Sequence, residues 1–250
     1  MQEKNNQFLK PELSVVVLGY RAGESLNFFI DELVGLLENK KIDYEIVLVG
    51  NFWFGSNDVT PEVVRSLARE NPRIKPVVKE KQGRMGWDMR SGFEAAGGDL
   101  VAVIDGDGQM LAADIIRVYQ EIKQSDVDLV KTYRIKRGDG FWRRFISLNY
   151  NFLFAVLFPK INSRDINSKP KILKRNFFDK INLASNDWFA DAEIMIKARR
   201  YKIKMVEIPT EFKENEKRPS FVKFPAIWEF IKNLIKYRIK EFKFNRRRNT

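Results

Sequence analysis

The 250-residue sequence contains neither cysteine nor histidine. Without cysteine, structural disulfides and thiolate metal sites are excluded. Without histidine, the chain lacks the side chain that most often transfers protons near neutral pH, and most zinc chemistry is excluded with it. Any acid–base catalysis must therefore depend on aspartate or glutamate.

Long hydrophobic runs are also missing. No stretch reaches the roughly 20 consecutive apolar residues that a membrane-spanning helix needs. The longest apolar stretch, residues 145–158, is interrupted by serine, asparagine and tyrosine. Residues 1–12 are polar and charged and give no signal peptide. We therefore expect a cytoplasmic protein, soluble or peripheral at the cytoplasmic face of a membrane.

Acidic residues are in the minority, because 33 Asp and Glu stand against 45 Lys and Arg and the formal net charge is +12. This charge favours anionic partners such as nucleotides, lipid phosphates, membranes or nucleic acid. The length suits one large α/β domain, with or without a C-terminal appendage. We expect a tail over residues 1–12, a domain over 13–222, and a basic amphipathic helix with its tail over 223–250.

The most informative stretch is an apolar run that ends in acidic residues. Residues 100–104 read Leu-Val-Ala-Val-Ile, which predicts a strand buried on both faces of a parallel sheet. Such sheets bind ligands at the carboxyl ends of their strands, where Asp105-Gly-Asp107-Gly-Gln109 follows. The oxygen ligands Asp107 and Gln109 suit Mg²⁺ or Mn²⁺ that is also bound by phosphate oxygens. The alternative is a solvated Asp-Gly turn.

A segment punctuated by glycine precedes this strand. Residues 82–99 predict a loop, a short helix and a Gly-Gly turn. With the acidic motif, the segment resembles the family-two glycosyltransferases of GT-A fold, whose pattern is N-x-G-x-x-x-A-x-x-x-G-x-x-x-A-x-G-D, an apolar strand and D-x-D. It most resembles the branch of dolichyl-phosphate mannose synthases and other polyprenyl-phosphate sugar transferases. That branch has D-x-D-x-Q, which Asp105, Asp107 and Gln109 match.

The resemblance implies a GT-A fold, an α/β architecture with a Rossmann-like, mostly parallel sheet flanked by helices. It implies inverting transfer of a sugar from a UDP- or GDP-linked donor to a polyprenyl phosphate or to a glycan hydroxyl. Mg²⁺ or Mn²⁺ would be held by Asp107 and Gln109 with Asp105 nearby, and would neutralise the leaving diphosphate. The residues that the resemblance assigns to the nucleotide sugar are Leu18, Tyr20, Glu24, Asn51, Gly83, Asp88, Asp105, Gly106 and Asp107.

The start of the predicted nucleotide-binding region departs from the family pattern. Residues 13–49 predict a strand, a helix and a strand, but Leu18 stands where the family usually has proline. After the second strand, a Gly-Asn pair ending at Asn51 and an inserted aromatic segment, residues 52–54, replace the acidic pair that helps to hold the base and ribose. Asn51 could bind a base edge and Trp53 could stack on it. For the aromatic residues, packing in the core is the alternative.

A second group of residues is expected at the acceptor or at phosphate groups. Arg134 ends the predicted strand 128–134, at the point where the family places an arginine near phosphate, and a guanidinium fork suits phosphate oxygens. A surface position is its alternative. Residues 165–171 resemble the family segment Asp-x-x-Ser-Gly-Phe-Arg, with Lys-Pro-Lys at the end. The predicted acceptor or phosphate ligands are Arg134, Arg137, Ser168, Lys169 and Arg218.

Asp191 lies near the start of a helix predicted to end at Arg200. In the family a carboxylate here faces the acceptor and can act as the base, although a helix N-terminus favours carboxylates even without a function. A base is needed for a sugar hydroxyl, but hardly for a phosphate, whose oxygen is already ionised. The predicted catalytic residues are Asp191, Asp107 and Arg134.

Two helices rich in aromatic residues are predicted over residues 141–158 and 224–242. The first mixes aromatic residues with arginine, which is typical of a membrane interface, and burial is the alternative. In the second, apolar residues recur at three- and four-residue steps with lysines between them. A basic amphipathic helix is typical of binding to an anionic membrane surface. Docking of the apolar stripe onto the domain is the alternative, and both can hold at once.

Two other functions are weighed against this interpretation. The net charge and the basic run over residues 246–248 suggest a nucleic-acid-binding module. That reading explains neither the acidic motif nor the glycine-rich loop, so no nucleic acid partner is expected. The altered Gly-Asn pair at Asn51 leaves open a catalytically silent relative.

Overall fold

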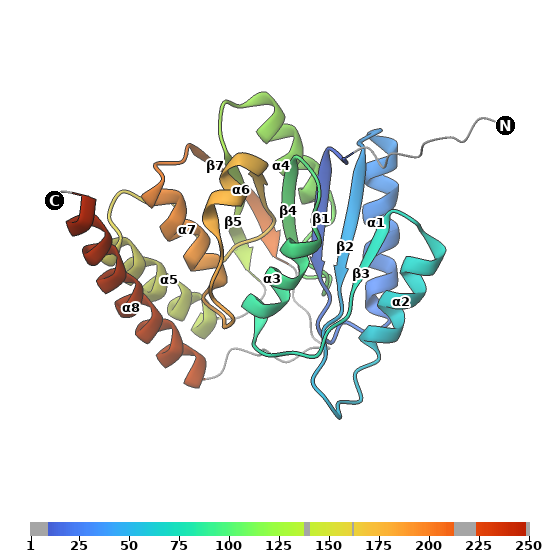
Figure 1. Cartoon of the computed structure of the whole chain (residues 1–250), viewed down its shortest axis with the longest axis horizontal. Helices are drawn as coiled ribbons and strands as arrows, with labels where there is room; N and C mark the ends of the chain where they lie inside the picture. Colours follow the sequence, from blue (N-terminus) through green and yellow to red (C-terminus); the bar gives the residue numbers. More distant parts are fainter. Residues whose placement is uncertain (1–9, 138–140, 162, 213–223, 249–250) are drawn as a thin grey trace.

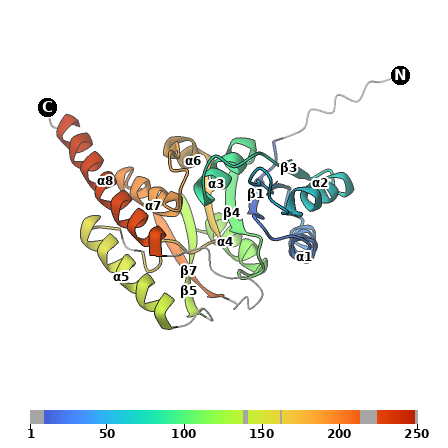
Figure 2. The ribbon, with the colours of Figure 1, turned by 90° about the horizontal axis from the view of Figure 1, so that it is seen from below.

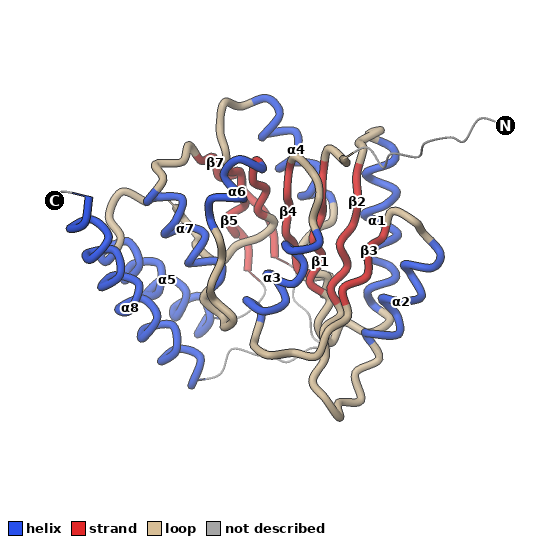
Figure 3. The backbone as a smooth tube through the Cα atoms, in the orientation of Figure 1, coloured by secondary structure: helices blue, strands red, loops and turns tan. Residues whose placement is uncertain are grey.

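The computed structural model describes residues 10–137, 141–161, 163–212 and 224–248. Figures 1 and 3 show one central sheet flanked by helices. The strands are β1 (Leu13–Leu18), β2 (Tyr44–Val49), β3 (Ile74–Val77), β4 (Leu100–Asp105), β5 (Leu129–Arg137), β6 (Lys171–Lys174) and β7 (Met205–Phe212). The helices are α1 (Ser25–Asn39), α2 (Thr60–Glu70), α3 (Met85–Ala95), α4 (Ala113–Gln124), α5 (Phe141–Leu157), α6 (Arg175–Ile181), α7 (Ala190–Arg200) and α8 (Phe224–Arg248).

The sheet is mostly parallel. Its 7 strands follow the order β3-β2-β1-β4-β6-β5-β7. β3, β2, β1 and β4 pair in parallel, as do β5 and β7, while β6 runs antiparallel between β4 and β5. The α/β fold with a mostly parallel sheet is therefore confirmed, and β6 and α6 add to the elements expected from the sequence.

Helices cover both faces of the sheet, which explains why β1, β2 and β4 are largely apolar. Every residue of β1 and of β2 is buried. On one face, α1, α2 and α4 contribute side chains such as Leu26, Val64 and Ile115. On the other, α3 and α7 contribute Met89 and Ile194. Figure 2 shows these two helical layers.

The direction of winding changes between β1 and β4. The chain passes from β1 to β2 and β3 on one side and then returns to β4 on the other side of β1. Leu18 at the end of β1 pairs in register with Asp105 at the end of β4. In open α/β sheets, ligands bind outside the carboxyl ends of the strands at such a point. The acidic motif therefore lies where this fold favours a ligand.

One face of α8 packs against the domain and another is exposed. Leu234 and Tyr237 are buried. Glu241 is also buried and forms ion pairs with Arg199 and Arg200 of α7. The helix thus packs on the domain through one face, while part of its apolar stripe stays exposed. Its exposed large apolar side chains are Trp228, Ile235, Ile239 and Phe242.

α5 lies beside α8 in Figures 1 and 2. The ring centroids of Tyr150 on α5 and Phe230 on α8 are 5.3 Å apart. Phe154 of α5 is buried, whereas Leu148, Phe152 and Val156 are exposed. Within the described part of the chain, no helix combines the length and hydropathy required to span a membrane. The domain limits proposed from the sequence stay a prediction.

Candidate active site

The acidic motif forms a tight turn at the end of β4. The backbone N–H of Gly106 donates to the carbonyl of Leu18 (2.9 Å), and that of Gln109 donates to Asp107 Oδ1 (3.1 Å). Gly108 adopts a φ of +75°, which favours glycine. A Cβ on Gly106 would lie 2.7 Å from Val17 Cγ1, so packing also requires glycine at this position. The turn predicted from the two glycines is confirmed.

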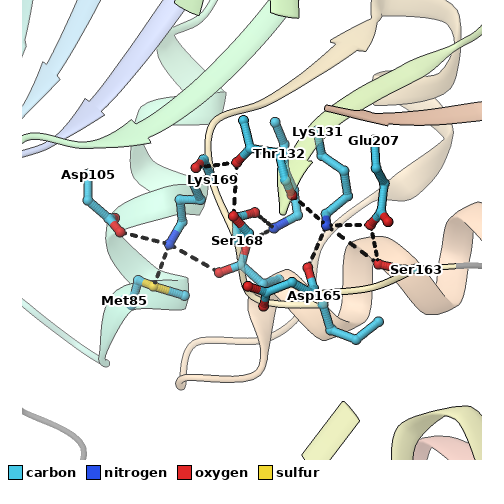
Figure 4. Close-up of polar contacts among 12 residues, drawn as sticks. Met85, Asp105, Lys131, Thr132, Ser163, Asp165, Ser168, Lys169 and Glu207 are labelled. Atoms are coloured by element: carbon cyan, nitrogen blue, oxygen red, sulfur yellow. Dashed lines mark hydrogen bonds and ion pairs between the residues drawn. The ribbon is translucent and has the colours of Figure 1, made fainter. Parts of the chain in front are cut away.

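A lysine side chain lies against the first acid of the motif. Lys169 Nζ is 3.2 Å from Asp105 Oδ2, 3.1 Å from Asp191 Oδ2 and 3.3 Å from Met85 Sδ. Figure 4 shows the ammonium group of Lys169 in contact with Asp105 and Met85. The Lys169 side chain is only 3% exposed. Burial lowers the pKa of Lys169, but Asp105 and Asp191 outweigh it and raise the pKa above its ordinary value.

Asp191, at the start of α7, is a buried carboxylate with lysine on both sides. Its Oδ1 is 2.5 Å from Lys171 Nζ, and its side chain is 2% exposed. Burial raises the pKa of Asp191, but Lys169 and Lys171 more than offset this and hold it below its ordinary value. A carboxylate held in this way is a weak base.

Two further buried lysines lie behind Lys169, and sequence reasoning did not assign them to the site. Lys171 Nζ donates to the carbonyl of Ser168 (2.7 Å), and burial lowers the pKa of Lys171 to about 8. Lys131 Nζ pairs with Glu207 Oε1 (2.8 Å) and donates to the carbonyl of Thr132 (2.9 Å). Burial also lowers the pKa of Lys131. In the sequence, the sign of these two lysines is that each stands next to a pair of apolar residues in a strand.

Arg134 is held by a carboxylate in two-pronged geometry. Its Nε donates to Asp165 Oδ2 (2.6 Å) and its Nη2 to Asp165 Oδ1 (2.9 Å). The Arg134 side chain is 11% exposed, so the fork lies close to the surface rather than on it. Nearby, the hydroxyls of Thr132 and Ser168 are hydrogen-bonded (2.9 Å). The structure thus brings Arg134, Ser168 and Lys169 into one region.

Two predicted phosphate ligands remain without a structural account. Arg137 ends β5, but its side chain lies outside the described residues, and so does all of Arg218. Their contact with phosphate stays a prediction.

On the donor side, Asn51 and Asp88 meet in a buried network. Asn51 Nδ2 donates to Asp88 Oδ1 (3.0 Å), and Asn51 Oδ1 accepts from the backbone N–H of Lys79 (2.8 Å). Asp88 is also paired with the buried Lys81, whose Nζ lies 4.2 Å from the ring centroid of Tyr20. A direct base contact by Asn51 stays a prediction.

The other predicted donor residues lie at the end of β1 and in the segments that follow β1 and β2. Trp53 is 39% exposed and Phe54 is 84% exposed, so the alternative that they pack in the core is wrong. Leu18 is buried at the end of β1. Glu24 is exposed before α1 and accepts a hydrogen bond from Asn27 Nδ2 (2.7 Å).

The glycine-rich loop before α3 is hydrogen-bonded through its backbone to the segment before α7. The backbone N–H of Arg84 donates to Asn186 O (2.6 Å), and that of Gly86 to Asp187 O (2.8 Å). A Cβ on Gly83 would lie 2.4 Å from Asn186 O. Close packing of two loops therefore requires glycine at Gly83, and its predicted contact with the donor stays a prediction.

The donor set at the turn fits a hard divalent cation. In the part of the chain that the structure describes, no group of three or more Asp and Glu side chains could hold a metal by itself. Asp105, Asp107 and Gln109 nevertheless offer two carboxylates and one amide oxygen on one turn. Mg²⁺ commonly takes one or two carboxylates and completes its shell with water and substrate phosphates. These residues suit such an ion together with a bound diphosphate.

The sequence also matches a known family model. Residues 14–189 match glycosyl transferase family 2. The chain is 30% identical over 241 residues to a dolichyl-phosphate beta-glucosyltransferase of Trichomonas vaginalis, covering 91% of this chain and 73% of that protein. It is 27% identical over 233 residues to a dolichol-phosphate mannosyltransferase of Pyrococcus furiosus, covering 89% of this chain and 62% of that protein.

Solved structures agree on the fold. Mannosyl-3-phosphoglycerate synthase from Rubrobacter xylanophilus superposes with a TM-score of 0.73 at 17% identity, covering 94% of this chain and 76% of that one. Glucosyl-3-phosphoglycerate synthase from Mycobacterium tuberculosis with uridine diphosphate gives 0.70 at 15% identity, covering 91% and 80%. The chain has the fold of these GT-A enzymes, and it belongs to glycosyl transferase family 2, in the branch of the polyprenyl-phosphate sugar transferases.

Proposed function

We propose that the protein transfers a sugar, with inversion, from a nucleoside diphosphate sugar to a polyprenyl phosphate at a membrane surface. The observation that carries this choice of acceptor is the state of Asp191. Its carboxylate is buried between two lysines and has a lowered pKa, which makes it a poor general base. A phosphate acceptor requires little base catalysis, because its oxygen is already ionised.

Donor activation is assigned to the turn after β4. Asp107 and Gln109, with Asp105 beside them, would hold Mg²⁺ or Mn²⁺, which when bound neutralises the charge of the leaving diphosphate. Tyr20, Trp53 and the Asn51–Asp88 network border the nucleotide. Arg134, held by Asp165, presents a guanidinium suited to phosphate oxygens. Ser168 completes this proposed phosphate region.

The names of the relatives support this assignment. Two are named as a dolichyl-phosphate beta-glucosyltransferase and a dolichol-phosphate mannosyltransferase, and a Rhizobium johnstonii relative, 26% identical, is named dodecaprenyl-phosphate galacturonate synthase. Structures of the M. tuberculosis synthase contain uridine diphosphate with Mn²⁺ or Mg²⁺.

Membrane binding is assigned to α5 and α8. Phe152 of α5 and Trp228 of α8 are 71% and 65% exposed. Exposed lysines such as Lys236 and Lys240 flank the apolar side chains of α8. Apolar and cationic groups on one helix favour the surface of an anionic membrane. This would place the site near a lipid-linked acceptor.

The decisive experiment compares two acceptors that differ only in the phosphate. The chain is incubated with UDP- or GDP-sugars, Mn²⁺, and either a polyprenyl phosphate or the corresponding polyprenol. We expect transfer to the phosphate only, and loss of transfer in EDTA or with Asp107→Ala. Transfer to the polyprenol would instead support the alternative in which the acceptor is a hydroxyl and Asp191 acts as base. Full activity in EDTA would contradict the metal assignment, and no transfer from any donor would support a silent relative.

A further inference from the structure

We propose that Lys169 is a resident counter-ion of the acidic motif, which makes divalent-cation binding dependent on the nucleotide. The inference rests on the proposed use of a metal at Asp105, Asp107 and Gln109. Lys169 would thereby be a positioning residue of the donor site, in place of the direct acceptor contact expected from the sequence.

The geometry around Lys169 carries the inference. Its ammonium group bridges Asp105 Oδ2 at 3.2 Å and Asp191 Oδ2 at 3.1 Å. The Asp105 side chain is 27% exposed, whereas that of Lys169 is 3% exposed. The ammonium therefore approaches Asp105 from the protein side, where water screens it poorly. Figure 4 shows this approach from the loop that precedes β6.

Asp191 does not depend on Lys169 alone for its charge balance. Lys171 Nζ lies 2.5 Å from Asp191 Oδ1. Lys169 is thus shared between a carboxylate that has its own lysine and Asp105 at the end of β4. The family-like segment has glycine where this chain has Lys169, so this positive charge is a departure of this chain from the pattern.

An ammonium beside Asp105 weakens the attraction of the turn for a second cation. The ion alone would meet a motif whose negative charge is already partly neutralised. A nucleoside diphosphate adds negative charge of its own, so the ion and the nucleotide should bind more tightly together than separately. Because such coupling is reciprocal, each should raise the affinity for the other. The lysine would thus disfavour a metal-loaded site without a donor.

The test is the affinity of the nucleotide-free chain for Mn²⁺, measured by isothermal titration calorimetry. Lys169→Gln should bind Mn²⁺ about tenfold more tightly than the unaltered chain, because a charge about one ion-pair distance from Asp105 has been removed. Lys169→Arg keeps the charge and should stay within about twofold of the unaltered chain. A merely structural lysine gives no reason for tighter binding on its removal.

Lys197→Gln is the matched control. It removes the same charge from an ion pair with Glu193 on α7 (2.6 Å), and it should leave Mn²⁺ affinity unchanged. If Lys169→Gln binds Mn²⁺ no more tightly than Lys197→Gln does, the inference is wrong.

A second measurement combines Lys169→Gln with a substitution of Asp105. Asp105→Asn should weaken Mn²⁺ binding less in the unaltered chain than in Lys169→Gln, because the lysine already offsets the Asp105 charge. Equal weakening in both backgrounds would contradict the inference. If Lys169→Gln does not fold, the unaltered chain still tests the inference. Mn²⁺ binding that is equally tight with and without a nucleoside diphosphate would overturn it. Failure of all chains to bind Mn²⁺ even with nucleotide would overturn the proposed metal site itself.

Discussion

Lys171 shows how this site places charge where water is absent. Its side chain has no exposed surface, and burial lowers its pKa to about 8 from an ordinary 10.5. Asp191, 2.5 Å away, opposes that shift. A buried ion pair of this kind is costly to break, because one partner would be left as an isolated charge.

The lowered pKa of Lys171 predicts a pH dependence of stability. Between about pH 8 and the ordinary lysine value of 10.5, the unfolded chain holds a proton that the folded chain has released. The free energy of unfolding should therefore rise with pH in this window, because the unfolded state binds more protons. Lys171→Met removes this contribution and keeps Lys169 beside Asp191.

The measurement is urea unfolding of both chains from pH 7.5 to 10.5. Because the two chains share all other titrating groups, their difference isolates Lys171. The stability of the unaltered chain should increase relative to that of Lys171→Met as the pH rises. A difference that is constant, or that falls with pH, would show that Lys171 keeps its proton in the folded protein.

At the scale of elements, local patterns were enough for most helices and strands but not for β6. β4 could be predicted because five apolar residues in a row require burial on both faces. β6 has only Ile172 and Leu173 between lysines. Its burial depends on Lys171 finding Asp191, 20 positions further along the chain, and on antiparallel pairing with β4 and β5. A local pattern contains neither piece of information.

The two faces of α8 predict opposite responses to substitution. Leu234 is fully buried, whereas its neighbour Ile235 is 51% exposed. Leu234→Ala should lower the free energy of unfolding by about 2–4 kcal/mol, through lost burial and the cavity left behind. Ile235→Ala, the matched control, should stay within about 0.5 kcal/mol of the unaltered chain. Chemical denaturation of both variants would reveal whether α8 docks as described; equal effects would contradict it.

At the scale of the whole molecule, the sequence located the site better than it described its contacts. Asp105 and Leu18 could be expected to meet, because parallel strands end at the same edge of the sheet. The pairing of Arg134 with Asp165 could not, since it joins residues 31 positions apart through side chains alone. The same holds for Lys169, whose partners come from β4 and α7.

The last prediction concerns membrane binding by the exposed faces of α5 and α8. If α8 binds a membrane, its outward side chains Ile235, Ile239 and Phe242 enter the lipid interface and its exposed lysines meet anionic headgroups. Replacing these three apolar side chains by glutamine should weaken binding to anionic vesicles by about tenfold or more, because burying each such side chain is worth of order 1–3 kcal/mol. Raised salt should weaken the remaining binding further.

Phe28→Gln supplies the control for this experiment. Phe28 is 82% exposed on α1, which lies at the opposite end of the molecule from α8 in Figure 2. Its replacement removes an exposed aromatic group without touching α5 or α8, and should leave vesicle binding unchanged. The triple variant should unfold at the same urea concentration as the unaltered chain, since its substitutions lie on exposed positions. Vesicle sedimentation gives the answer: if the triple variant sediments like Phe28→Gln, the exposed face of α8 is not the membrane-binding surface.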